Sequence, residues 1–300
     1  MFKDELKKFV LENPKLVNMR SAGEGIFVLK YSRRVFYDNL WNDFLEECRG
    51  TIVDADFNVV SRPFTKIYNY GVEAKAPVLA DDVEVTAYRK VNGFMAAVTV
   101  HNGELLVSTT GSTANDYVDY AKEIMAKHAP LADWLMVLNT ADTEGMTFMF
   151  ECVHPSDPHI IVETPGMYLL GYRENSWDSK VGHNPVVIID LALALNCFHA
   201  ESFATNMAHL QVMAKECRHE GFVFYTQEGV SAKIKSPYYL TAKWVARNPR
   251  TNKLLTKEFK EQIDEEYYPL LDHIRDNIVA YTALDEQARL AWVRNYLQES

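Results

Sequence analysis

The sequence predicts an α+β protein in which antiparallel sheets are flanked by helices, with a small all-α module at the C-terminal end. Short segments alternate apolar and polar residues in the way that strands do, most clearly at 83–89, 94–100 and 104–109. The turn dipeptide Asn102-Gly103 joins the last two segments and is typical of a hairpin. Residues 255–300 carry helical periodicity and almost no strand signal.

The other elements are predicted from the same two periodicities. A helix is expected over 1–20, where Phe2, Leu6 and Phe9 share one face. Residues 114–139 predict a helix that is broken near Pro130. Residues 186–216 are predicted to be mostly helical. Further strands are expected at 25–31, 51–60 (as a hairpin), 146–153, 159–163, 167–173, 221–226 and 230–235.

Composition and length limit the class of protein. The chain has 300 residues and 48% hydrophobic content, which is enough for one large domain or two smaller ones with a real core. After Pro237 the sequence pattern changes from strand-like alternation to helical periodicity, and a turn cluster follows at 248–252. We therefore expect one large domain over 1–242 and a short helical domain over 243–300.

The sequence also indicates the compartment of the protein. No run of eighteen apolar residues occurs, so we expect no membrane span. The four cysteines show no metal-binding spacing, which favours reduced thiols in a cytoplasmic protein. The formal charge of -10 argues against coating of nucleic acid by bulk electrostatics, but it allows a local basic site for phosphates.

The segment Lys90-Val91-Asn92-Gly93 follows the strand expected at 83–89 and is the sharpest functional candidate. A lysine amine attacks phosphorus only when it is deprotonated, and neighbouring cations with partial burial promote that state. Arg89, Lys233 and Lys235 are candidates for those cations. Alone, the segment would be better explained as a surface lysine beside a turn. The blocks that follow downstream favour the functional interpretation.

Two carboxylates, Glu151 and Glu220, adjoin apolar strand segments. Such positions suit a hydrated Mg²⁺ ion held against a phosphate, although an ordinary strand end is the alternative. Lys233 and Lys235 are two residues apart and so share one face of a strand. An anion between them would relieve their repulsion. The alternative is a charged edge strand that prevents aggregation.

In their order along the chain, these blocks resemble the covalent nucleotidyltransferase superfamily, and more closely the RNA ligase 1 family of the bacteriophage T4 type. The resemblance covers about residues 20–240. The matching stretches are Glu47-Cys48-Arg49-Gly50, Ser61-Arg62-Pro63 with Lys66, Lys90-Val91-Asn92-Gly93, Thr110-Gly111-Ser112, Phe150-Glu151-Cys152-Val153-His154-Pro155, Leu169-Leu170-Gly171-Tyr172-Arg173-Glu174-Asn175, Glu220-Gly221-Phe222 and Lys233-Ile234-Lys235-Ser236.

The resemblance implies a nucleotidyltransferase (ATP-grasp-like ligase) domain and a role for each residue. Lys90 would attack the α-phosphate of ATP and become lysyl-AMP. Lys233 and Lys235 would grip that phosphate in the transition state. Glu151 and Glu220 would organise the metal ion, Mg²⁺ or Mn²⁺.

The same resemblance implies further contacts with the nucleotide. Arg49 and Lys66 would contact the phosphates of ATP, and Arg89 would supply another cation. Gly93 would let the backbone approach the nucleotide. Phe222 would lie near the adenine.

One departure from the family pattern concerns Asn92, where the family usually has aspartate. An amide offers a metal's water shell only a neutral oxygen. The sequence therefore leads us to expect that Asn92→Asp leaves adenylation intact or improves it. The segment 107–112 also lacks lysines that the T4 enzyme carries before its Gly-Ser.

Taken together, the resemblance implies an ATP-dependent RNA ligase that joins 5′-phosphate and 3′-hydroxyl RNA ends through lysyl-AMP and AppRNA. Its expected substrates are single-stranded RNA or nicked tRNA, in RNA repair, as a monomer in the cytoplasm (the host cytoplasm, if a bacteriophage encodes it). An end-healing kinase or phosphatase would be its partner. Two alternatives remain: a ligase that seals nicked duplexes, and an RNA-binding relative with impaired catalysis.

Overall fold

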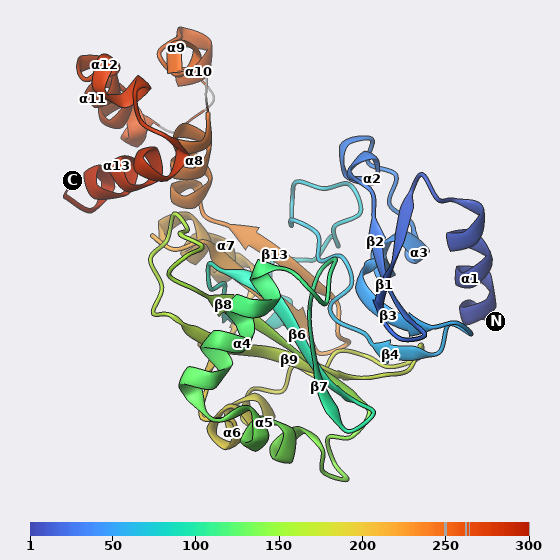
Figure 1. Cartoon of the computed structure of the whole chain (residues 1–300). Helices are drawn as coiled ribbons and strands as arrows, with labels where there is room; N and C mark the ends of the chain where they lie inside the picture. Colours follow the sequence, from blue (N-terminus) through green and yellow to red (C-terminus); the bar gives the residue numbers. More distant parts are fainter. Residues whose placement is uncertain (249–250, 262, 264, 300) are drawn as a thin grey trace. The chain divides into compact units, whose positions relative to one another are not determined.

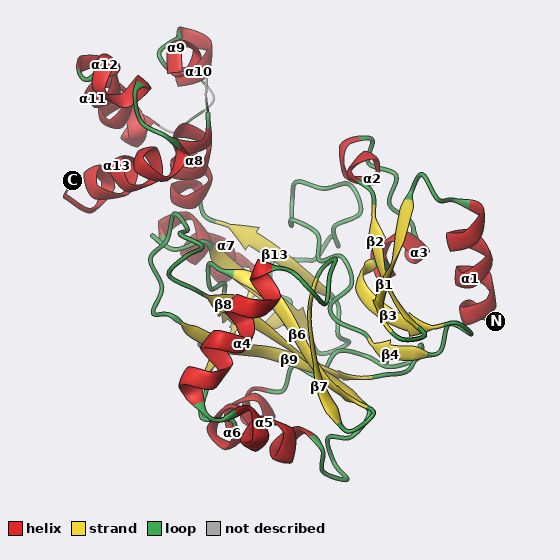
Figure 2. Cartoon of the chain, viewed as in Figure 1, coloured by secondary structure: helices red, strands yellow, loops and turns green. Residues whose placement is uncertain are grey.

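The computed structural model describes residues 1–248, 251–261, 263 and 265–299. It confirms an α+β protein with antiparallel sheets and flanking helices (Figure 2). The chain forms two compact units, each built from separate segments. Unit 1 comprises 1–68, 93–155 and 164–201, and unit 2 comprises 69–92, 156–163 and 202–300. Within the described ranges, no helix combines the length and apolar character that crossing a membrane requires.

Unit 1 contains two sheets. The first has four antiparallel strands in the order β1-β2-β3-β4, and the second has five in the order β10-β9-β8-β6-β7, of which β10 alone runs parallel to its neighbour. The strands are β1 Val17–Gly23, β2 Ile26–Tyr31, β3 Arg49–Asp54, β4 Val59–Ser61, β6 Phe94–His101, β7 Glu104–Thr109, β8 Met146–Val153, β9 Gly166–Glu174 and β10 Phe198–His199.

The helices of unit 1 include one pair that covers the five-stranded sheet. The expected break at Pro130 separates α4 from α5, and α4 packs against β7 and β9 (Figure 1). The buried side chains Ala121, Ile124 and Met125 form its sheet-facing stripe. The helices are α1 Phe2–Glu12, α2 Arg33–Tyr37, α3 Asp43–Glu47, α4 Asp116–His128, α5 Leu131–Leu138 and α6 Pro185–Ala194.

Unit 2 contains one antiparallel sheet in the order β11-β5-β12-β13. Helix α7 packs on one face of it, where Ala87, Leu210 and Phe224 belong to a common apolar core. The elements are β5 Glu84–Arg89, β11 Ser202–Asn206, α7 Met207–Glu216, β12 Gly221–Thr226 and β13 Ser231–Lys235.

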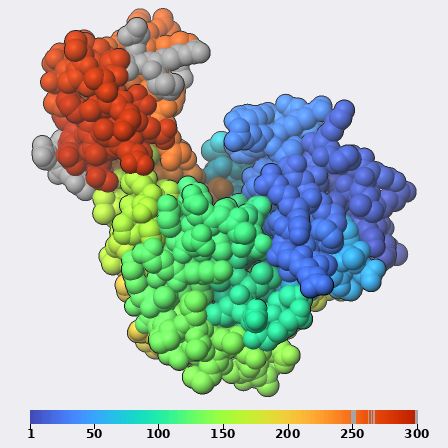
Figure 3. All heavy atoms as spheres, viewed as in Figure 1, coloured from blue at the N-terminus to red at the C-terminus, as the bar shows by residue number. Residues whose placement is uncertain are grey.

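The last part of unit 2 is helical, as the periodicity predicts. In the space-filling view, the side chains of these helices pack against one another (Figure 3). Their core includes Val245, Ile274, Tyr281 and Val293. The elements are α8 Pro237–Arg247, α9 Thr251–Leu254, α10 Lys257–Lys260, the 3₁₀ turn η1 Glu265–Tyr267, α11 Tyr268–Asp276, α12 Ile278–Thr282 and α13 Glu286–Glu299. The boundary expected at residue 242 falls within α8 and stays a prediction. Pro249 and Arg250 of the turn cluster lie outside the described residues.

Two predicted elements are wrong in extent or type, and a third, the mostly helical segment 186–216, is confirmed but interrupted. The helix expected over 1–20 stops at Glu12, before Asn13-Pro14, and the chain continues as β1. The segment 159–163 is not a strand. Within 186–216, helix α6 ends just before Asn196, whose left-handed φ of 51° stops the helix, and two short strands precede α7.

Candidate active site

Pairing between β5 and β12 positions Lys90 beside Glu220. The strands are antiparallel with Phe222 opposite Arg89, and the backbone N–H of Lys90 donates to the carbonyl of Gly221 at 2.8 Å. The residue after β5 therefore lies beside the residue before β12. This register brings Lys90 and Glu220, which are far apart in the sequence, together where β5 ends and β12 begins. We call this end of the unit 2 sheet the catalytic edge.

The Glu220 carboxylate is the centre of this edge. Its side chain is 3% exposed, and it accepts from the Lys90 ammonium at 3.0 Å and from the Lys235 ammonium at 2.9 Å. Burial alone would raise the pKa of Glu220, but the two ammonium groups outweigh it and lower the pKa to about 2. Glu220 is therefore an ionised carboxylate that holds two lysine amines a short distance apart.

Asn92 fixes the same carboxylate from a third direction. Its Nδ2 donates to Glu220 Oε2 at 2.6 Å, and its Oδ1 accepts from the backbone N–H of Ile161 at 3.2 Å. A carboxylate can only accept and a backbone N–H can only donate, so the two partners define which end of the amide is which. The Asn92 side chain is therefore committed to positioning Glu220.

Gly221 is required by the close approach of the neighbouring strand. Its φ is +124°, and a β-carbon there would overlap the carbonyl oxygen of Ile234 on β13. The glycine of Glu220-Gly221-Phe222 thus lets β13 come close enough for Lys235 to reach Glu220.

Arg89 has a carboxylate partner that the sequence did not suggest. Its Nη2 lies 3.0 and 2.9 Å from the two oxygens of Glu163, whose side chain is 5% exposed. Glu163 Oε1 also accepts from the backbone N–H of Asn92 at 3.3 Å. Arg89 is therefore neutralised and helps to fix the Lys90-Val91-Asn92-Gly93 segment, instead of presenting a free positive charge.

The two faces of the unit 2 sheet carry different side chains. Alternation along β12 and β13 puts Lys233, Lys235 and Val223 on one face. Phe222 points to the other face, where it is 3% exposed and its ring packs edge-to-face against Phe203. In this structure Phe222 supports the sheet from its core side, and its expected place near the adenine stays a prediction.

Two residues of α8 add to the lysine side of this cluster. The Lys235 ammonium lies 4.9 Å from the centre of the Tyr239 ring, and the Lys243 ammonium donates to the Tyr239 hydroxyl at 3.3 Å. Burial lowers the pKa of Lys243 to about 8, and the charges of Lys235 and Arg247 act in the same direction. This edge therefore gathers more positive than negative charge, as an anion site does.

In unit 1, Gly93 and Glu151 form a second small group. The backbone N–H of Gly93 donates to Glu151 Oε1 at 3.1 Å, and Phe94 pairs with Cys152 across β6 and β8. A β-carbon on Gly93 would overlap the carbonyl of Cys152. The glycine is needed for this close backbone packing, which brings the Glu151 carboxylate to the residue that follows Asn92.

The expected phosphate contacts Arg49 and Lys66 also lie in unit 1. Arg49 Nη1 donates to the carbonyl of Thr65 at 3.3 Å, and the Lys66 ammonium lies 4.4 Å from the centre of the Tyr68 ring. Lys30 is opposite Arg49 on β2, and burial, followed by the charge of Arg49, lowers its pKa to about 8. The sequence did not single out Lys30, which only the strand register reveals.

The motif residue Arg62 has a structural role. Its guanidinium makes a two-pronged ion pair with Glu47, at 2.6 and 3.0 Å, and both side chains are buried. Gly50 belongs to the same motif as Glu47, and a β-carbon there would lie 2.9 Å from the Cα of Thr110. These residues stabilise unit 1 from within.

The structure thus brings together Lys90, Glu220 and Lys235 in unit 2, and Gly93 with Glu151 in unit 1. Lys233 shares the sheet face of Lys235. Among the described residues, no group of three or more His, Cys, Asp or Glu side chains is arranged to hold a metal ion. Both Glu220 oxygens accept from lysines in this structure, and the expected metal contact of Glu220 stays a prediction.

Comparisons with known proteins place this geometry in a family. A family model described as RNA ligase, of the T4 type, matches residues 47–239. A putative ATP-dependent DNA ligase from Aquifex aeolicus is similar in structure, with a TM-score of 0.55, 15% identity, and 98% of this chain and 78% of that chain covered. An archaeal ATP-dependent RNA ligase has a TM-score of 0.56 and 14% identity, covering 97% and 76%. No curated protein matches the sequence.

These structures share the fold of this chain, in which a lysine cluster surrounds one buried carboxylate. The family match covers more than half of the chain. The chain therefore belongs to the T4-type RNA ligase family.

Proposed function

We propose that the protein joins 5′-phosphate and 3′-hydroxyl ends of RNA through lysyl-AMP and AppRNA, with Lys90 as the nucleophile. The observation that carries the proposal is the position of the Lys90 amine, 3.0 Å from a Glu220 carboxylate that also holds Lys235. One amine can react with phosphorus while the second neutralises the charge that develops on the phosphate.

In the first step, the Lys90 nitrogen forms a bond to the α-phosphorus of ATP, and the bond to pyrophosphate breaks. The lysine must first lose a proton. A carboxyl group with a pKa of about 2 is a very weak base, so Glu220 is not the acceptor of that proton. Its proposed role is to hold the Lys90 and Lys235 amines in position until the triphosphate takes over as their anionic partner.

In the next two steps, the adenylate leaves Lys90. An oxygen of the RNA 5′-phosphate attacks the adenylate phosphorus, and the P–N bond breaks to give AppRNA. The 3′-hydroxyl then attacks the 5′-phosphate, so that AMP leaves and the strand is sealed. Lys235, with Lys233 on the same sheet face, would stabilise the charge at each phosphorus.

A divalent cation, Mg²⁺ or Mn²⁺, would supply charge neutralisation at the phosphates. Of the two expected metal residues, Glu151 is assigned this task, because its carboxylate is held by the backbone N–H of Gly93, whereas both Glu220 oxygens accept from lysine ammonium groups. We assign Glu151 to the hydration shell of the metal and Glu220 to the lysines. Arg49 and Lys30, adjacent on β3 and β2, are proposed to contact the ATP phosphates together with Lys66.

The biological task is proposed from the family alone. Repair of cleaved RNA, such as nicked tRNA of a bacteriophage-infected cell, would require an end-healing kinase or phosphatase to prepare the ends. We expect the ligase itself to act as a monomer in the cytoplasm.

A sealing assay tests the proposed function. Purified protein is incubated with ATP, Mg²⁺ and a 5′-phosphorylated RNA, presented as a single strand, as a splinted RNA nick or as a splinted DNA nick. We expect sealing of the single strand, none with Lys90→Arg, and wild-type sealing with the matched change Lys253→Arg on an exposed helix. Preferential sealing of the splinted DNA would show a nick-sealing ligase instead, and RNA binding without sealing would show an impaired relative.

A further inference from the structure

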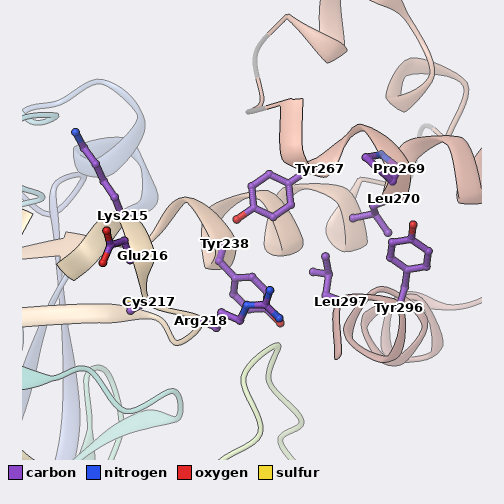
Figure 4. Close-up of a pocket in the computed structure, with 10 residues that line it drawn as sticks. All are labelled: Lys215, Glu216, Cys217, Arg218, Tyr238, Tyr267, Pro269, Leu270, Tyr296 and Leu297. Carbon is purple, nitrogen blue, oxygen red and sulfur yellow. The ribbon is translucent and has the colours of Figure 1, made fainter. Parts of the chain in front are cut away.

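A cavity of about 550 Å³ lies within unit 2, away from the residues assigned to catalysis above. It opens where the end of α7 and the following loop meet the C-terminal helices (Figure 4). Cavities of about 300–1,000 Å³ are typical of sites that bury one small organic group. Its lining residues are Lys215, Glu216, Cys217, Arg218, Tyr238, Tyr267, Pro269, Leu270, Tyr296 and Leu297.

The aromatic lining comes from three separate elements. Tyr238 begins α8, Tyr267 ends η1 and Tyr296 is near the end of α13 (Figure 4). Leu270 and Leu297 are buried beneath them. Tyr296 stacks on His273 with ring centres 4.7 Å apart, so its ring is held in place before any ligand arrives. Rigid aromatic faces of this kind suit a flat heterocycle.

The charged lining is mainly cationic. Arg218 is exposed at the cavity, and Lys215 extends away from the tyrosines (Figure 4). Burial raises the pKa of Tyr238, whereas the charges of Arg218 and Arg294 oppose that rise. Glu216 is the acidic residue in the lining. Two cations against one carboxylate line this cavity, on a chain whose formal charge is -10.

We propose that this cavity binds one nucleotide of a single-stranded RNA, with its base against the tyrosines and its phosphate at Arg218. A phosphodiester complements the cationic rim, and a base is flat enough to contact the aromatic faces. Glu216 can accept a hydrogen bond from a base amino group. This inference rests on the proposed RNA-joining function and adds a substrate contact outside the catalytic edge.

Fluorescence anisotropy with a short labelled single-stranded RNA tests the cavity. Arg218→Glu should weaken binding roughly tenfold and flatten the salt dependence, because a phosphate contact is lost. Tyr238→Leu should weaken binding at least about fivefold, whereas Tyr238→Phe keeps an aromatic face and should bind nearly as well as the wild type. Arg33→Glu is the matched control, because Arg33 is exposed on α2 and the charge change is the same.

The transfer of labelled AMP from ATP to the protein is measured on the same samples. We expect it to be unchanged in Arg218→Glu, because Arg218 is not part of the catalytic edge. If Arg218→Glu and Tyr238→Leu bind RNA like the wild type while AMP transfer persists, the cavity inference is wrong and the proposed function stands. If the wild type binds RNA but accepts no AMP, the proposed function fails, whatever the cavity variants do.

Discussion

Asn92 donates its side-chain N–H to the Glu220 carboxylate at 2.6 Å while its amide oxygen accepts from the backbone of Ile161. Asn92 is 4% exposed and Glu220 is 2% exposed, so water does not screen this contact effectively. The asparagine therefore satisfies both neighbours, because it donates to the Glu220 carboxylate and accepts from the backbone N–H of Ile161. An ionised aspartate can only accept, so it could not do both.

Because of this contact, we now expect the opposite effect of Asn92→Asp from the one predicted by the sequence alone. A second carboxylate against Glu220 would repel it, and one of the two would be forced to take a proton. We predict that Asn92→Asp lowers the rate of AMP transfer at neutral pH by about tenfold or more and the free energy of unfolding by about 1–3 kcal/mol. Reactions quenched at successive times measure the rate of AMP transfer, and urea unfolding measures the free energy of unfolding.

Asn92→Ser serves as the comparison, because it removes the contact without adding charge. It should be less harmful than Asn92→Asp. An aspartate variant that transfers AMP faster than the wild type would show that Asn92 does not position Glu220 in the way described.

Acid should weaken unit 2 through Glu220. Its pKa is about 2 when folded, against 4.5 for an ordinary glutamate, so the folded state binds the proton less readily than the unfolded state. The stabilisation, about 3 kcal/mol, is complete above about pH 4.5 and is lost as the pH falls towards 2. Glu220→Gln should therefore be less stable than the wild type at pH 7, with the difference disappearing in that acid range. Equal pH dependence of unfolding in both proteins would contradict the ion-paired arrangement.

Lys243 should have the opposite signature. Burial, with the charges of Lys235 and Arg247, lowers its pKa to about 8 from 10.5, so its ammonium is disfavoured in the folded state. Removal of this charge by Lys243→Met should raise the free energy of unfolding at pH 7 by about 1 kcal/mol, after allowance for solvent screening. The advantage should shrink as the pH rises from about 8 to 10.5. Pyrophosphate should stabilise the wild type more than the variant, and a pH-independent difference would exclude this explanation.

Alanine substitutions at Gly93 and Gly103 distinguish a glycine that is needed for close packing from one that is needed for its backbone conformation. Gly93→Ala forces a β-carbon into the carbonyl of Cys152 and displaces the N–H that Glu151 accepts. We expect a loss of about 2–4 kcal/mol in unfolding free energy together with loss of AMP transfer. Gly103→Ala has open space around it but a φ of +78°, so it should cost only about 1 kcal/mol and leave AMP transfer intact. Similar losses in both variants would show that Gly93 has no special packing role.

The sequence predicted the elements whose structure is determined by residues close to one another along the chain. The Asn102-Gly103 hairpin, the break at Pro130 and the C-terminal helices were predictable, because turn chemistry and periodicity determine them within one segment. The helix expected over 1–20 is wrong beyond Glu12, because the following residues form β1 and pair with β2. The local helical periodicity of 1–20 carries no information about that pairing.

The candidate site was predictable in part. Lys90, Glu220 and Lys235 could be selected because the resemblance supplied their order, and the sheet register then joined them. Glu163 could not be found in this way, because its partner Arg89 is distant in sequence and the segment 159–163 read as a strand. Nor could the sequence show that Phe222 packs in the protein interior, because that depends on which face of the sheet α7 covers.

Mass spectrometry of the protein after incubation with ATP and Mg²⁺ tests the central claim most directly. We predict a gain of one adenylate, found by peptide mapping on Lys90 and absent from Lys90→Arg, with Glu220→Gln forming the same adduct more slowly. An adenylate on another residue, or no adduct on a wild-type protein that binds ATP, would contradict the account.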